Sequence, residues 1–220
     1  MRLIAFGCSN TYGQGLPDCH FVRNNKFEPG PHPSKHAWPQ QLGKLLNADS
    51  VINMGQPGAS NKQISTNALN FEFEPNDFVV CHWSLIHRNC VFYPDKDTLG
   101  LGLWDIPEKA IGDAYQRYIA ATNSDYNLMI ESCHYINHTH LYIKPQVKHL
   151  YHVVFRAAEF YNLPSWTRYE FICDAGYYNR IYPVALDGCH TGVQGHKELA
   201  KNIFDKHIGK ELPGKAEQSN

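Results

Sequence analysis

The chain has 220 residues, of which 43% are hydrophobic, so it is long enough and apolar enough for one folded domain with a sizeable core. Its 20 basic and 21 acidic residues give a formal net charge of −1 without a marked charge run. This balance argues against a dedicated nucleic-acid-binding or anionic-membrane surface. We expect a single domain over residues 1–212 and a frayed tail over 213–220.

The cysteines and the first residues predict the compartment. Seven cysteines are an odd number, and the sequence holds no Cys-x-x-Cys pair, which argues against a disulfide framework and against a thiolate zinc site. The apolar run before Gly7 is too short for the core of a signal peptide. No apolar run approaches the roughly 18 residues of a membrane-spanning helix. These features favour a cytoplasmic protein with free thiols.

Short apolar runs alternate with helical patterns along the chain. Buried strands are predicted at 2–6, 50–54, 77–83 and 169–174. Apolar residues at helical spacing predict helices on the stripes Trp38, Leu42, Leu45 and Leu46; Ala110, Ile111, Ala114, Tyr115, Tyr118 and Ile119; Leu150, Val153, Val154, Ala157 and Tyr161; and Leu199, Ala200, Ile203, Phe204 and His207. Residues 17–36 and 89–106 are typical of loops, and 123–146 are compatible with a helix that Pro145 ends or kinks. This alternation predicts an α/β fold with a parallel sheet covered by helices on both faces.

A polar segment follows the first predicted strand, with the sequence Gly7-Cys8-Ser9-Asn10-Thr11-Tyr12-Gly13. A serine on a tight strand-to-helix turn can act as a nucleophile, and its backbone N–H can bind an oxyanion. Serine is also a favoured helix N-cap, so this segment by itself leaves both roles open.

Two more polar segments follow the second and third predicted strands. In Asn53-Met54-Gly55-Gln56-Pro57-Gly58-Ala59-Ser60-Asn61, the N–H of Gly58 can donate to an oxyanion and Asn61 can position a loop or a substrate. The alternative is a Pro-Gly turn capped by Ser60 or Asn61. In His82-Trp83-Ser84-Leu85-Ile86-His87-Arg88, Ser84 and Arg88 can reach a pocket, while Trp83 is either a packing or a substrate-binding residue.

The last polar segment is Asp187-Gly188-Cys189-His190-Thr191-Gly192-Val193-Gln194-Gly195-His196. An aspartate three residues before a histidine can hold one ring nitrogen, which leaves the other free to take a proton from a serine. His196 is the competing histidine, with capping or packing as its expected role. Ligands bind at the carboxyl ends of strands in open parallel sheets, so these segments can converge there.

Taken together and in this order, the segments around Ser9, Gly58 and Asp187–His190 resemble the SGNH (GDSL-type) hydrolases. The resemblance implies a three-layer, flavodoxin-like α/β/α sandwich and an esterase, lipase or carbohydrate acetylesterase activity on a small-molecule ester or acylated sugar. It implies that Ser9 is the nucleophile, that His190 is its base oriented by Asp187, and that the N–H groups of Ser9 and Gly58 bind the oxyanion. It implies no metal and no organic cofactor.

The sequence departs from that family in two places. Cys8 stands where the first block usually has aspartate. The third block, usually Gly-x-Asn-Asp, is missing, and residues 83–88 stand in its place. We expect Ser84 to supply the missing oxyanion donor, with Asn61 or Arg88 as substitutes, and we expect Asn61, Trp83 and Arg88 to contact substrate.

Three other interpretations remain. His134, His138 and His140, followed by His149 and His152, could bind zinc if the segment is helical, although the His-Glu-x-x-His pattern is absent. A non-catalytic module that binds a glycan or another ligand on the same fold is the main alternative, because the third block is missing. A Rossmann-type nucleotide-binding domain is disfavoured, because Gly7-x-Ser9 replaces the Gly-x-Gly-x-x-Gly pattern.

Overall fold

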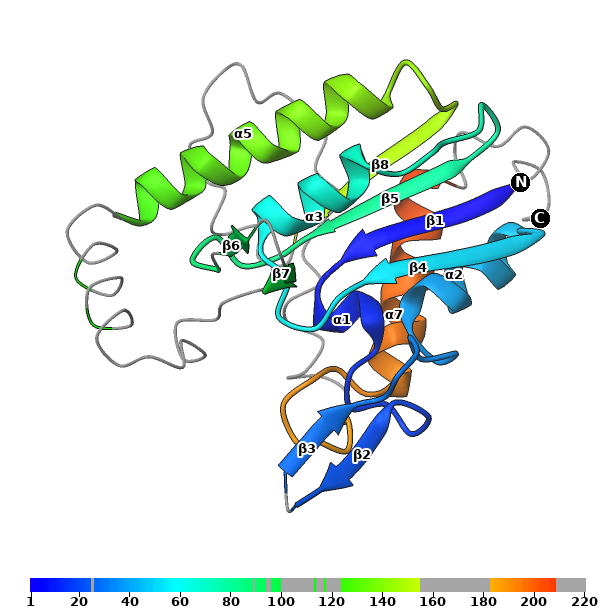
Figure 1. Cartoon of the computed structure of the whole chain (residues 1–220). Helices are drawn as coiled ribbons and strands as arrows, with labels where there is room; N and C mark the ends of the chain where they lie inside the picture. Colours follow the sequence, from blue (N-terminus) through cyan, green and yellow to red (C-terminus); the bar gives the residue numbers. More distant parts are fainter. Residues whose placement is uncertain are drawn as a thin grey trace.

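The computed structural model describes residues 1–24, 26–88, 90–93, 96–99, 113, 117, 124–154 and 183–208. Its centre is a parallel sheet of order β4-β1-β5-β8, formed by β1 (Arg2–Gly7), β4 (Ser50–Gly55), β5 (Phe78–Trp83) and β8 (His149–Val154). Helices α2 (Trp38–Leu46) and α7 (Val193–Ile203) cover one face, and α3 (Asn61–Leu69) and α5 (Asp125–Ile143) cover the other (Figure 1). The predicted α/β/α sandwich with a flavodoxin-like sheet is confirmed.

Strand β1 is buried on both of its faces. Ile4 and Phe6 pack in the cluster under α3 and α5, whereas Leu3 and Ala5 pack in the cluster under α2 and α7. Successive side chains of a strand point to opposite faces, so a strand covered on both sides must be apolar at every position. This is why the uninterrupted run at 2–6 predicted the strand correctly.

The helix predicted over residues 150–161 is wrong, at least over its described part. Residues 149–154 form β8, which pairs in parallel with β5. Leu150 and Val154 pack on the α3–α5 side and Val153 on the α2–α7 side, as the alternation of a strand requires. A short apolar run fits both the helical period and the strand period. Residues 149–154 form a strand because they can pair with the edge of β5. Residues 155–161 lie outside the described part.

The two predicted loops each contain a small antiparallel hairpin. Residues 17–36 include β2 (His20–Arg23) paired with β3 (Lys26–Pro29), and residues 89–106 include β6 (Val91–Tyr93) paired with β7 (Lys96–Leu99). Helix α5 ends two residues before Pro145, as expected. The final predicted helix is α7, which runs into a π-helical turn, η3 (Phe204–Ile208). Two predicted elements, the strand 169–174 and the tail 213–220, lie outside the described part, and of the helix 110–119 only residues 113 and 117 lie inside it.

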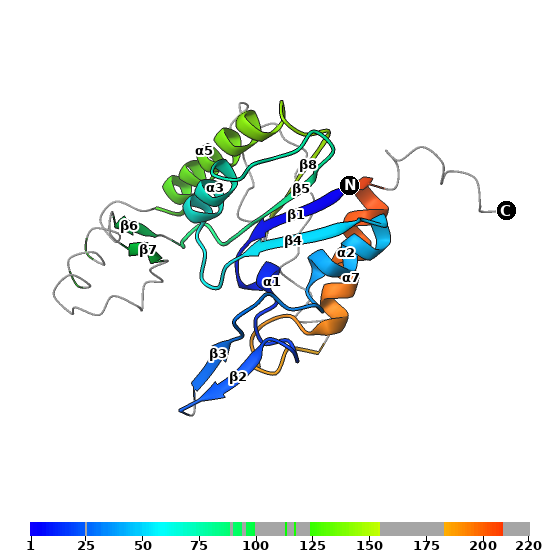
Figure 2. The same cartoon turned by 45° about the vertical axis from the view of Figure 1, so that its right-hand side comes forward.

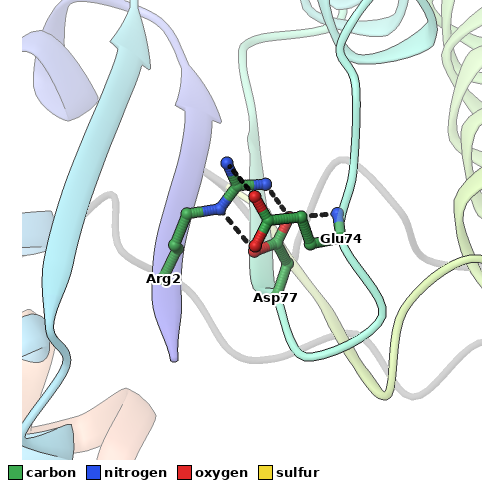
Figure 3. Close-up of polar contacts among 3 residues, drawn as sticks. All are labelled: Arg2, Glu74 and Asp77. Carbon is green, nitrogen blue, oxygen red and sulfur yellow. Dashed lines mark hydrogen bonds and ion pairs between the residues drawn. The ribbon is translucent and has the colours of Figure 1, made fainter.

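An ion pair joins the amino ends of β1 and β5. Arg2 donates from Nε and Nη2 to the two carboxylate oxygens of Asp77, at 2.8 and 2.7 Å, and its Nη1 lies 2.9 Å from Glu74 (Figure 3). Asp77 also accepts a hydrogen bond from the backbone N–H of Glu74. Burial acts to raise the pKa of Asp77, but the bonds from Arg2 and Glu74 outweigh it and hold the pKa below its ordinary value. This bidentate pair fixes β1 beside β5 at the edge of the sheet opposite α1.

Three histidines of the described part are buried in the core, namely His82, His152 and His196. Burial lowers the pKa of His82 to about 4. Burial and the neighbouring His140 lower that of His152 to about 3, and burial, His82 and His190 lower that of His196 to about 3. Each ring uses a nitrogen in a hydrogen bond, such as the one from Trp83 Nε1 to His152 Nδ1 at 3.0 Å. The three rings are therefore neutral at pH 7.

No helix among the described residues is long and apolar enough to cross a membrane.

These neutral histidines predict a loss of stability in mild acid. Below a pH of about 6.5 these histidines bind protons in the unfolded chain but not in the folded chain. The free energy of unfolding therefore decreases as the pH is lowered from about 6.5 to the folded pKa values of about 3 to 4. The slope should reach about 1.4 kcal/mol per pH unit for each buried histidine. Urea unfolding at pH 7.5, 6.0 and 5.0 measures it.

The variant His152→Gln should lower the slope of this dependence by about one proton, and the exposed Ser50→Ala, which removes no titratable group, should leave the slope unchanged. A free energy of unfolding that is flat from pH 7.5 to 5.0 would contradict the prediction.

Candidate active site

Ser9 is the first residue of the short helix α1 (Ser9–Tyr12), which follows β1 directly. Cys8, not Ser9, takes the N-cap position, and its side chain makes no capping hydrogen bond. The side chain of Ser9 is therefore not used as a cap, although the residue is only 2% exposed. Thr11 anchors the helix from below, because its hydroxyl accepts from Trp38 Nε1 at 3.4 Å and lies 3.1 Å from His82 Nδ1.

The turn after β4 lies against the start of α1. Gln56 N–H donates to the carbonyl of Gly7 at 3.0 Å, and Asn53 Nδ2 donates to the carbonyl of Thr11 at 2.7 Å. Ala59 N–H donates back to Gln56, which closes a turn with Pro57 and Gly58 at its centre. The predicted Pro-Gly turn is present, and Ser60 caps α3 by accepting from Gln63 N–H.

Gly58 has a left-handed backbone, with φ of +77°, which is the conformation that the third position of such a turn demands. It is exposed, and a side chain added there would meet no atom within 4 Å. Among the described residues its N–H forms no hydrogen bond. Gly58 is thus an exposed backbone donor without a partner among the described residues, as an oxyanion donor requires.

Asn61 links α3 to the end of β5. Its Oδ1 accepts from Ser84 N–H at 2.7 Å, and its Nδ2 donates to the Ser84 carbonyl at 3.2 Å and to Ser132 Oγ at 3.0 Å. Both amide hydrogens are used inside the protein and Asn61 is only 2% exposed. In this structure Asn61 holds the backbone of Ser84 and has no donor left for a substrate, contrary to the role expected from the sequence.

The other residues expected near the substrate differ in whether they have polar atoms left for a ligand. Trp83 is fully buried, and its ring stacks on His152 at 5.9 Å, so its place is in the core. The hydroxyl of Ser84 is buried and has no hydrogen-bond partner among the described residues, and the same holds for Nη1 of the half-buried Arg88. A buried polar atom without a partner is costly, so both groups are free to bind a ligand atom.

Asp187 and His190 form a tightly bonded pair. His190 Nδ1 lies 2.5 Å from Asp187 Oδ2, and Asp187 Oδ1 accepts from the backbone N–H groups of His190 and Cys189 at 3.0 and 3.1 Å. Burial acts to raise the pKa of Asp187, but these bonds outweigh it and hold the pKa below its ordinary value. An ionised carboxylate only accepts, so Nδ1 carries the ring proton and Nε2 is left as a base.

The loop that carries this pair is docked on the segment after α1. Leu186 N–H donates to the carbonyl of Gly15 at 2.9 Å, and a side chain at residue 15 would lie 2.6 Å from the Asp187 carboxyl group. Gly15 also has a left-handed φ of +81°, so glycine is required there twice over. In both views the loop before α7 lies at the α1 end of the sheet, beside the β2–β3 hairpin (Figures 1 and 2). Sequence reasoning missed Gly15, although the spacing Gly13-x-Gly15 was a signal for it.

His196 links α7 to the start of α2. It is buried in α7, and its Nδ1 accepts from the backbone N–H of Trp38 at the start of α2. The expected capping or packing role is therefore the one that the structure displays, with α2 as the helix that is capped. The structure brings Asp187 and His190 together, and among the described residues no hydrogen bond joins Ser9 to His190.

The histidines of α5 do not gather around a common point. His134 and His138 are exposed, while His140 turns inward and its Nδ1 lies 3.0 Å from His152 Nε2. Within the part of the chain that the structure describes, three metal-ligating groups come together only at Asp187, Cys189 and His190. The alternative interpretation of a zinc site at the α5 histidines therefore finds no cluster of three ligands among the described residues.

Comparison with family profiles and with curated proteins found no match. Comparison with solved structures found a mutant of Axe2, an acetyl-xylooligosaccharide esterase from Geobacillus stearothermophilus, at 16% identity and a TM-score of 0.51, covering 100% of this chain and 97% of that one. The chain has the SGNH hydrolase fold.

Two further structures agree with this fold. The acetyl xylan esterase Est2A from the rumen bacterium Butyrivibrio proteoclasticus is 12% identical with a TM-score of 0.52, covering 93% of this chain and 63% of that one. The structure of TesA is 12% identical with a TM-score of 0.51, covering 93% of this chain and 96% of that one. The resemblance predicted from the sequence is thus confirmed at the level of the fold.

The bonds of Asn61 predict that the variant Asn61→Ala is destabilised. It leaves the buried N–H and carbonyl of Ser84 without their partner, which should lower the free energy of unfolding by about 3 kcal/mol. Asn67→Ala, at a half-exposed position of the same helix, should change it by less than about 0.5 kcal/mol. Urea unfolding of the two variants beside the parent checks both values, and equal effects would refute the structural role of Asn61.

Proposed function

We propose that this chain is a serine hydrolase that cleaves an ester through Ser9, His190 and Asp187. The observation that carries the proposal is the Asp187–His190 pair, in which the carboxylate holds Nδ1 and leaves Nε2 without a hydrogen bond among the described residues, docked against the segment that follows Ser9. It stands on a fold shared with esterases, at the edge of the sheet where ligands bind.

The mechanism follows from the available donors and acceptors. His190 Nε2 takes the proton of Ser9 Oγ, and Ser9 attacks the ester carbonyl carbon. The resulting oxyanion receives hydrogen bonds from the N–H groups of Ser9 and Gly58 and from the unpartnered hydroxyl of Ser84. His190 then protonates the departing alcohol, and water attacks the acyl-enzyme with the same histidine as base. These steps use side chains, backbone groups and water.

Proton transfer requires Ser9 Oγ and His190 Nε2 to approach to about 2.6–3.2 Å. The loop 183–192 is the mobile partner in this proposal, because α1 is held by the buried Thr11. We propose as substrate a small-molecule ester or an acylated sugar, the class that the names of the two acetylesterase structures suggest. Arg88, whose buried Nη1 has no hydrogen-bond partner among the described residues, is our candidate for contacting the substrate's polar groups.

Labelling with a fluorophosphonate probe tests the nucleophile. The parent chain should be modified at Ser9 and should hydrolyse p-nitrophenyl acetate. Ser9→Ala should lose the label and at least about 10³-fold in kcat, because no other group can form the acyl-enzyme. The exposed Ser50→Ala should keep both. A folded parent chain that is not labelled would favour the alternative, a non-catalytic module that binds a glycan or another ligand.

The role of Asp187 predicts a second effect on kcat. In Asp187→Asn one carboxylate oxygen becomes an NH₂ group, which must face either the backbone N–H groups or His190 Nδ1. The second arrangement moves the ring proton to Nε2 and removes the base, so kcat should fall by about 10³–10⁴-fold. Asp205→Asn, an exposed change in η3, is the control. Unchanged kcat in Asp187→Asn, measured with p-nitrophenyl acetate, would remove the aspartate from the mechanism.

A further inference from the structure

Three different metal-ligating groups lie together in the loop before α7. The ligand atoms of Asp187, Cys189 and His190 all lie within 4.8 Å of one another. Cys189 Sγ is 3.4 Å from His190 Nδ1, and Asp187 Oδ2 is 2.5 Å from the same nitrogen. Carboxylate, thiolate and imidazole are the ligands that zinc takes in proteins.

The spacing is close to that of a zinc site. Zinc binds sulfur at about 2.3 Å and nitrogen or oxygen at about 2.0–2.2 Å, so tetrahedral neighbours lie about 3.4–3.6 Å apart. The sulfur–nitrogen separation already has this value, and the carboxylate needs to draw back by about 1 Å to make room for the ion. Cys189 is exposed and His190 is 17% exposed, so an ion can enter from solvent. Three protein ligands leave the fourth position to water.

We propose that Asp187, Cys189 and His190 bind a zinc ion reversibly, and that zinc binding switches off the hydrolase. The binding stands on the geometry of the loop alone, whereas the inhibition rests on the proposed function. The Cys189 thiol gives up its proton to solvent and binds as thiolate, and Asp187 binds as the carboxylate that it already is.

Inhibition follows from the chemistry of the imidazole ring. Zinc occupies Nδ1, the nitrogen that carries the proton in the metal-free pair, so the ring proton moves to Nε2. An Nε2 that carries a proton on a neutral ring has no lone pair for the proton of Ser9. Zinc also draws Asp187 away from the ring that it orients. The residues that make His190 a base therefore also make it a ligand, and Cys189 is the additional group that completes the site.

Direct binding tests the site whether or not the chain is an enzyme. Untagged full-length chain is titrated with Zn²⁺ against a chromogenic chelator. We expect one ion per chain, a Kd at least ten-fold weaker for Cys189→Ser, and an unchanged Kd for the double variant His134→Ala/His138→Ala. That double variant is the matched control, because these exposed histidines one helical turn apart are the rival ligands. An unchanged Kd in Cys189→Ser, or lost binding in the double variant, would overturn the site.

Inhibition is then measured on p-nitrophenyl acetate and on fluorophosphonate labelling. Equimolar zinc should suppress both at least ten-fold in the parent chain, and EDTA should restore them. Cys189→Ser should hydrolyse the ester without zinc as the parent does and should resist zinc. Persistent activity of the zinc-loaded parent would overturn the switch. A parent that binds zinc through Cys189 but never labels or hydrolyses would instead refute the proposed function and leave the metal site standing.

Discussion

The parallel pairing of β1 between β4 and β5 is the constraint on which the rest of this molecule depends. The register aligns Gly7 with Gly55, and it carries β5 past Phe6 to Trp83 and Ser84. Because all of these strands run in the same direction, the segments that follow them emerge at one edge. The sheet can hold this position because β1 is apolar and buried from Leu3 to Phe6 and because the Arg2–Asp77 pair fixes its other end (Figure 3). Ser9, Gly58 and Ser84 therefore share an edge although they are far apart in the chain.

Beneath that edge the protein uses buried polar groups to hold the backbone still. Thr11 contacts Trp38 and His82, and His196 caps α2. Asn61 fastens Ser84 to α3, and Ser65 of the same helix bonds Thr139 of α5 at 2.7 Å. Buried hydrogen bonds are costly to break, so these contacts make the layer rigid. Among the described residues, the Ser84 hydroxyl and one nitrogen of Arg88 are buried without a hydrogen-bond partner, and the exposed Gly58 N–H is unpaired, so these groups are available for chemistry.

The loop that carries Asp187 and His190 has a different character. Among the described residues, its Leu186 N–H bonds to Gly15, Asp187 fits closely against that glycine and Ala185 packs with Leu16 and Ala37, whereas Gly188 and Cys189 face solvent. An aspartate that holds the histidine through Nδ1 produces a good base, and it also places oxygen, nitrogen and the neighbouring sulfur around one point. The same local turn thus orients the histidine for catalysis and gathers the ligands of the proposed metal site. The exposed Cys189 is the residue that makes metal binding possible there.

The sequence by itself determined the sandwich, the strands β1, β4 and β5, the helices α2 and α7, and the pairing of Asp187 with His190, and it was compatible with the helix α5. These features depend on local pattern: unbroken apolar runs, helical stripes, the stop at Pro145, and a three-residue spacing. Only the tertiary structure decided that residues 149–154 form a strand, because a short apolar run fits either period and the free edge of β5 made the choice. It also decided that Trp83 belongs to the core and that the side-chain amide of Asn61 is hydrogen-bonded to the backbone of Ser84. A side chain's role depends on which partners the fold brings within hydrogen-bond reach, and spacing along the chain does not contain that information.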